Sequence, residues 1–133
     1  MPREIDISLI STLSSPGTTE RMLKEFETQF GLQVHLQKQT WSTAWAGLVH
    51  YTIYKNAPDV SEIGSTWISD LIGMNALRPF TQGEIISFGG SQAFFPSAWN
   101  SGVGIDGQVW SIPWLIDSRL LYYRRDLLEK PGV

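Results

Sequence analysis

Residues 5–73 repeat a strand followed by a helix three times, and this order constrains the fold more than any other feature of the sequence. In the first unit, residues 5–10 begin with alternating apolar and polar side chains, the two-residue period of a strand. Apolar side chains at Met22, Phe26 and Phe30 then follow at helical spacing. Because helical crossovers between parallel strands are right-handed, the repeat predicts an α/β fold with a mostly parallel sheet and helices on its faces.

Cap and turn residues give the limits of the first two units. Thr18 or Thr19 can cap the first helix, and Gly31 stands where a left-handed residue typically ends a helix. A second strand is predicted over residues 32–40, and Ser42 is predicted to cap the helix that follows it.

The third unit and the remainder of the chain have weaker patterns. We expect a strand over 59–63 and then a helix that starts at Ser65 or Thr66. The Asp-Gly pair within 105–109 predicts a hairpin turn, since this dipeptide favours the positive φ values that a tight turn needs. Residues 118–123 resemble a further strand.

Composition excludes several classes of protein. The chain has 133 residues, enough for one ordinary domain, and its 42% hydrophobic and 17% charged residues argue against disorder. A net charge of -3 disfavours nucleic-acid binding, which requires a basic surface. The absence of cysteine excludes thiol catalysis, disulfides and thiolate metal sites, and we expect neither a metal nor a cofactor.

The second half carries motifs that resemble a known family. Residues 106–113 (DGQVWSIP) precede 120–133 (LLYYRRDLLEKPGV), and 57–60 (APDV) precede 77–80 (LRPF). In this order the segments resemble the extracellular solute-binding proteins of family 1 from ABC importers, the maltose-binding-like group. The chain departs from the family pattern with Trp110 at a usual tyrosine, Ser111 at a usual glycine, and two arginines where Asn-Lys is typical.

The resemblance implies a two-lobed periplasmic-binding-protein fold of which this chain matches the first part. Residues 1–110 would form the core of the N-terminal lobe, a three-layer α/β unit, and 111–133 the first crossover toward a second lobe that is absent from the sequence. The implied function is binding of a sugar or small polar solute, without catalysis, for delivery to an ABC permease. The lobe would then be incomplete and would hold half of a binding site.

Ligand contacts are expected where loops leave the carboxyl ends of the strands, as in other open α/β sheets. The resemblance also places contacts in the loop of Trp67 and in the spacer of Asp117. The candidate ligand-binding residues are Ser14, Ser15, Thr18, Trp41, Ser65, Thr66, Trp67, Trp114 and Asp117. Of the six tryptophans, we expect Trp41, Trp67 and Trp114 in the cleft, and Trp45, Trp99 and Trp110 in the core.

Two other functions remain open. A small glycan hydrolase could use Asp106 and Asp117 as its carboxylate pair, although the Asp-Gly turn gives Asp106 a structural explanation. Alternatively, the chain is a self-associating interaction module, because an unpaired strand edge and an uncovered apolar segment at 120–128 promote homo-oligomers.

The resemblance implies a periplasmic or extracellular location. A basic segment followed by an apolar signal-peptide core is not visible after Met1, so a native start at this residue would imply the cytoplasm.

Overall fold

The computed structural model describes residues 3–10, 17–117 and 120–129. Its sheet has three parallel strands in the order β2-β1-β3: β1 (Arg3–Leu9), β2 (Leu32–Lys38) and β3 (Val60–Ser61). The register places Ile5 opposite Val34 and Ile7 opposite Val60. The predicted α/β fold with a parallel sheet is therefore confirmed, although β3 is shorter than the expected strand over 59–63.

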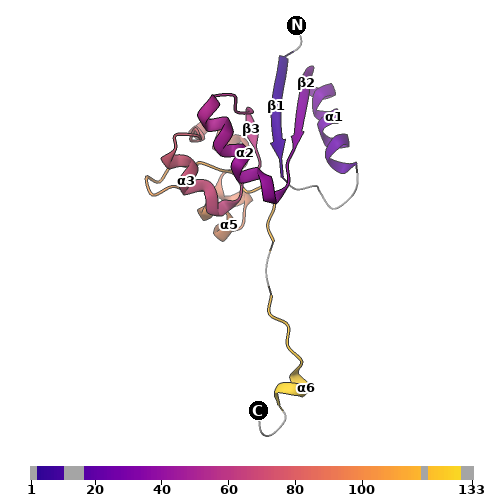
Figure 1. Ribbon diagram of the computed structural model, residues 1–133, viewed down its shortest axis with the longest axis vertical. Helices are drawn as coiled ribbons and strands as arrows, with labels where there is room; N and C mark the ends of the chain where they lie inside the picture. Colours follow the sequence, from indigo (N-terminus) through magenta and orange to yellow (C-terminus); the bar gives the residue numbers. More distant parts are fainter. Residues whose placement is uncertain (1–2, 11–16, 118–119, 130–133) are drawn as a thin grey trace.

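Two long helices flank the sheet. Helix α1 (Thr18–Phe30) connects β1 to β2, and α2 (Trp41–Tyr54) connects β2 to β3. Figure 1 shows α1 on one side of the strands, and α2 and α3 (Ile68–Gly73) on the other. This arrangement is the layered order that right-handed crossovers produce.

Helix limits follow local capping chemistry. Gly31 ends α1 in the left-handed conformation with φ 62°, as its position predicted, and its N–H donates to the Glu27 carbonyl. The start of α2 differs from the prediction: Thr40 and Thr43 form a reciprocal capping box, so the helix begins at Trp41, before Ser42.

The second half of the chain consists of short elements. The 3-10 helix η1 (Ser65–Trp67) precedes α3, and α4 (Gln82–Ser87), η2 (Ser91–Ala93) and α5 (Pro96–Ser101) follow. The predicted Asp-Gly turn is confirmed by an antiparallel bridge between Val103 and Val109 and by φ 75° at Gly107.

The core lies between the helices and the sheet. Five of the buried apolar side chains come from α2, α3 and α5, and two more follow β1 and the hairpin turn: Ala44, Leu48, Ile68, Leu71, Trp99, Ile10 and Val109. Trp99 stacks on Phe94 with ring centroids 5.4 Å apart, which confirms it as a core tryptophan. Trp110 is half-buried, and its indole donates to Asp106.

The C-terminal segment leaves this body at the end of the sheet where β1 and β2 end (Figure 1). The expected strand over 118–123 is wrong for Leu120–Tyr123, which adopt no regular structure, while residues 118 and 119 lie outside the described part. The short helix α6 (Arg125–Leu128) follows. Isolated strands need a sheet partner for their backbone groups, and local β-propensity alone does not supply one.

Candidate functional site

Loops that follow the two outer strands of the sheet, β2 and β3, leave it at the same carboxyl edge. The chain passes from β2 through Gln39 and Thr40 into α2, and from β3 into η1. Because β2 and β3 both run parallel to β1, these two loops emerge at the same end. The first residue of α2 is Trp41 and the last residue of η1 is Trp67, so the topology brings tryptophans from different loops together.

Three indole rings form a cluster at this edge, which we term the tryptophan cluster: Trp41, Trp45 and Trp67. The Trp67 ring lies 5.6 Å from the Trp41 ring and 5.6 Å from the Trp45 ring, measured between centroids, with interplanar angles of 60° and 52°. Trp41 remains 57% exposed and Trp45 36% exposed. The cluster is therefore an aromatic surface open to solvent, held by tilted ring contacts within the range that favours aromatic pairs.

Local geometry holds each part of the cluster. The capping box of Thr40 and Thr43 fixes the first turn of α2, from which Trp41 and Trp45 project one turn apart. On the other side, Trp67 packs over Gly64: a Cβ atom at that glycine would lie 3.2 Å from the indole Cδ2. A larger residue at position 64 would press against the ring.

The prediction that Trp45 lies in the core is wrong: its ring contacts Trp67 and remains 36% exposed. The signal that could have identified it is its i,i+4 relation to Trp41, which puts both rings on one helix face. Its helical phase with Leu48 pointed toward the interior, but Trp45 lies at the end of the helix where the sheet stops.

The described polar candidates lie on two different elements, η1 and α1. Ser65 and Thr66 are exposed on η1, immediately before Trp67, and Thr18 is half-buried in the first turn of α1. Ser14 and Ser15 lie outside the described residues. Within the described part of the chain, no three His, Asp or Glu side chains gather where they could hold a metal ion.

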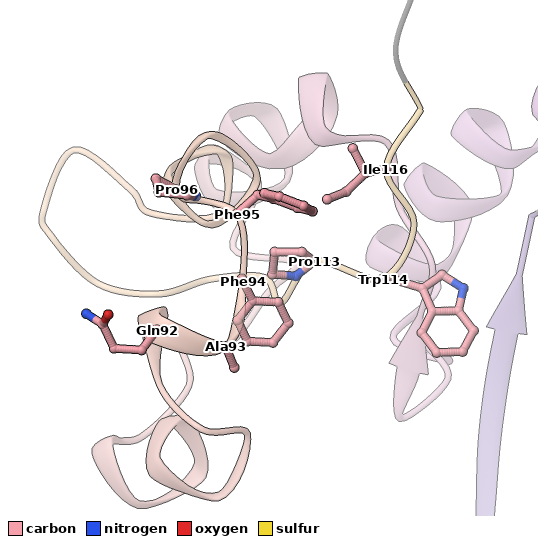
Figure 2. A pocket seen from close by; sticks show the side chains of 8 residues that line it. All are labelled: Gln92, Ala93, Phe94, Phe95, Pro96, Pro113, Trp114 and Ile116. Atoms are coloured by element: carbon pink, nitrogen blue, oxygen red, sulfur yellow. The ribbon is translucent and has the colours of Figure 1, made fainter.

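The two remaining candidates lie on the segment that leaves the body. Trp114 and Asp117 are both exposed. Trp114 borders a hollow of about 500 Å³ whose walls come from η2, α5 and the segment after the hairpin: Gln92, Ala93, Phe94, Phe95, Pro96, Pro113, Trp114 and Ile116. Figure 2 shows the Trp114 indole pointing away from this hollow. Among the described residues, no ring contact joins Trp114 to the tryptophan cluster.

Asp106, one of the two carboxylates considered for hydrolysis, is engaged in its own turn. It accepts hydrogen bonds from the Gln108 backbone N–H (3.0 Å), the Gln108 side chain (3.0 Å) and the Trp110 indole (3.2 Å). The Gln108 N–H, followed by the Trp110 indole, keeps the pKa of Asp106 below its ordinary value. These bonds hold the carboxylate ionised as an acceptor that closes the hairpin.

Comparison with known proteins identifies the family. The family described as bacterial extracellular solute-binding protein matches residues 21–133. The chain belongs to this family. A candidate binding protein of Brucella abortus (strain 2308) and another of Brucella suis biovar 1 (strain 1330) are each 25% identical to it over 115 residues, which is 86% of this chain. The chain spans only 27% of the length of these relatives.

A solved structure supports the same fold. The sugar-binding protein MalE from the phytopathogen Xanthomonas citri superposes with a TM-score of 0.74 at 24% sequence identity, and the match covers 98% of this chain and 33% of the MalE chain. The family and the fold are thus those of binding proteins. None of the helices in the described residues has the length and apolar character needed to cross a membrane.

Proposed function

We propose that this chain supplies the N-lobe half of the ligand site in a solute-binding protein of an ABC importer, and that the ligand is a saccharide. The observation that carries the proposal is the exposed tryptophan cluster at the carboxyl ends of β2 and β3. In open α/β sheets this edge is where ligands bind. Tilted indole rings offer broad apolar faces, and the C–H face of a sugar ring is flat and apolar enough to pack on them.

Hydroxyl groups around the cluster suit the polar rim of a sugar. Ser65 and Thr66 are exposed next to Trp67, and each hydroxyl can both donate and accept a hydrogen bond. Ser14 and Ser15, which follow β1 in the sequence, and Thr18, the first residue of α1, are further proposed contacts.

The segment after the hairpin would add the remaining contacts. Asp117 would accept hydrogen bonds from sugar hydroxyls, since carboxylate acceptors make the stronger bonds of this kind, and Trp114 would add a further aromatic face. In this proposal residues 1–110 are the lobe core and 111–133 lead toward a second lobe that completes the cleft. A permease partner and a periplasmic or extracellular location follow from the same proposal.

Tryptophan fluorescence tests the ligand class directly. The protein is titrated with glucose, maltose and trehalose, and in parallel with glutamate and inorganic phosphate. A half-site predicts weak binding, with a Kd of about 1 mM, equivalent to about 4 kcal/mol. Trp67→Ala removes the ring that contacts both other indoles and is expected to weaken sugar binding about tenfold, the effect of about 1.4 kcal/mol.

The matched control is Trp110→Phe, because Trp110 lies in the hairpin and contacts Asp106. It removes one indole but is expected to leave the sugar Kd unchanged. A response to glutamate or phosphate and to none of the sugars would overturn the saccharide class. Equal losses in the two variants would overturn the tryptophan cluster as the site.

A second candidate function, self-association, is favoured by one observation. The described C-terminal segment exposes large apolar side chains, with Leu121 92% and Tyr122 86% exposed. Surfaces of this kind drive association when nothing covers them. Light scattering across a concentration series tests it: a homodimer that Leu121→Ser dissociates supports the interaction module, and a monomer at every concentration rejects it.

A further inference from the structure

A glutamine amide joins the central strand to the helix that carries two of the three clustered tryptophans. Gln39 Nε2 donates to Ser8 Oγ at 2.9 Å and to the Tyr51 hydroxyl at 3.2 Å. The Tyr51 hydroxyl in turn donates to Gln37 Oε1 at 2.6 Å. Ser8, on β1, is 1% exposed, so this network reaches from the central strand of the sheet to the last turn of α2.

The amide occupies space that a glycine leaves on α2. A Cβ atom at Gly47 would lie 2.6 Å from Gln39 Oε1 and 3.3 Å from both Cδ and Nε2. All three nearest atoms belong to Gln39. Glycine in a helix interior costs stability relative to alanine, so this position gives up helix propensity to let the amide lie against the helix.

The apolar pattern of α2 does not by itself fix how the helix is rotated. Its sequence, WSTAWAGLVHYTIY, carries apolar side chains around much of the circumference, so several rotations would bury similar areas. Directional hydrogen bonds distinguish between them. The Gln39 backbone N–H also donates to the Leu9 carbonyl at 2.8 Å, which fixes the base of the glutamine on β1.

The helix is therefore anchored at two points along its length. The Thr40 capping box fixes its first turn, and the Gln39 amide fixes it at Gly47 and Tyr51. Tyr51 lies ten residues after Trp41, about 15 Å along the axis at 1.5 Å per residue. Two anchors this far apart set both the tilt and the rotation of the face that presents the indoles.

We propose that Gln39 is a positioning residue: lodged against Gly47 and bonded to Ser8 and Tyr51, it sets Trp41 and Trp45 at their contact distance from Trp67. Its effect on ligand affinity rests on the proposed function above. Its effect on the arrangement of the three indoles is a property of the free protein and is testable without any ligand.

Circular dichroism of the free protein provides the test, because closely spaced indoles give an exciton couplet in the far ultraviolet. Trp67→Phe first identifies the part of the couplet that the cluster produces. Gln39→Ala and Gln39→Glu, which both remove the donated N–H groups, are expected to lose most of that part. Ser8→Ala removes one acceptor and is expected to lose less of it. Gln33→Ala, an exposed glutamine on β2, is the matched control and leaves the couplet unchanged.

The pair of Gly47→Ala and Gln39→Ala separates positioning from general destabilisation. Gly47→Ala alone displaces the amide and is expected to lose the couplet as Gln39→Ala does. In the Gln39→Ala background it is expected to cause no further loss and to raise the unfolding temperature, because the obstructing atoms are gone and alanine favours the helix.

Two outcomes overturn the proposal: an intact couplet in Gln39→Ala with only a lower unfolding temperature, or losses that simply add in the double variant. If the Gln39 variants do not fold, Ser8→Ala serves as the test instead, and an unchanged couplet in Ser8→Ala likewise overturns the proposal. A protein that shows the expected couplets but binds no sugar refutes the proposed ligand class and leaves the positioning role intact.

Discussion

Replacing Gly102 with alanine tests the packing between α5 and the segment that leads out of the body. Gly102 is buried at the end of α5, and an added Cβ would lie 2.3 Å from the Ser111 carbonyl oxygen and 2.7 Å from its Oγ. Ordinary contact between such atoms needs more than 3 Å, so the backbone must separate by about 1 Å. No side-chain rotation relieves a contact with a carbonyl oxygen.

A separation of this size would lengthen the hydrogen bonds that join Gly102 to the segment after the hairpin. The Gly102 carbonyl accepts from the Trp110 N–H at 2.8 Å and from the Ser111 N–H at 3.3 Å. Losing one such bond costs about 1 kcal/mol, and the strain of overpacking adds about 2 kcal/mol. The free energy of unfolding should therefore fall by about 3 kcal/mol. The φ of Gly102 is -93°, which alanine also adopts, so backbone conformation contributes little.

Urea denaturation followed by fluorescence and circular dichroism measures the change, with the m-value checking that unfolding stays two-state. Gly83→Ala in α4 is the matched control: nothing lies within 4 Å of its added Cβ, so the same substitution should stabilise by about 0.5 kcal/mol. If the free energy of unfolding of Gly102→Ala lies within about 0.5 kcal/mol of the original value, the reasoning is refuted, because so small an effect is typical of surface substitutions without such a contact.

Three further predictions concern single sites. The Arg78 guanidinium, followed by the Thr81 N–H, lowers the pKa of Glu84 to about 2 from 4.5. The stability that this pairing contributes is therefore complete above about pH 4.5 and is lost as the pH falls toward 2. Thermal melts should show that Glu84→Gln flattens this pH dependence. Gly107 has φ 75°, so Gly107→Ala should lower the free energy of unfolding, measured by urea titration, by about 1 kcal/mol, and Gly107→Asn should lower it by less. Equal losses in the two variants would argue against backbone strain as the cause. Leu71 is 1% exposed, and Leu71→Ala should lower the free energy of unfolding by about 3 kcal/mol. Ile86→Ala, at an exposed site, should change the urea midpoint little. Similar losses of stability in the two variants would contradict the assigned core.

Local patterns determined much of the fold. The two-residue period of β1, the four-residue spacing in α1 and the left-handed glycine at 31 are properties of neighbouring residues, so each is readable without tertiary information. The Asp-Gly turn is equally local, because its positive φ depends on Gly107 itself. The order of strands and helices then restricted the sheet to parallel strands.

The start of α2 depends on a choice between two caps that lie close together in the sequence. Both Thr40 and Ser42 are good caps, and the reciprocal bonds between Thr40 and Thr43 decide between them. Likewise, the β-forming residues Leu121–Tyr123 stay outside the sheet, because a strand also requires a hydrogen-bonding neighbour.

The sequence by itself thus determined the α/β class, the parallel sheet and the edge at which Trp41 and Trp67 meet. Only the tertiary structure decided that Trp45 joins them and that the Gln39 amide lies in the space left by Gly47. The physical reason is range: periodicity and capping act over a few residues along the chain. The Trp45–Trp67 contact and the Ser8–Gln39 bond instead join distant residues, and they exist only once α2 has a fixed place on the sheet.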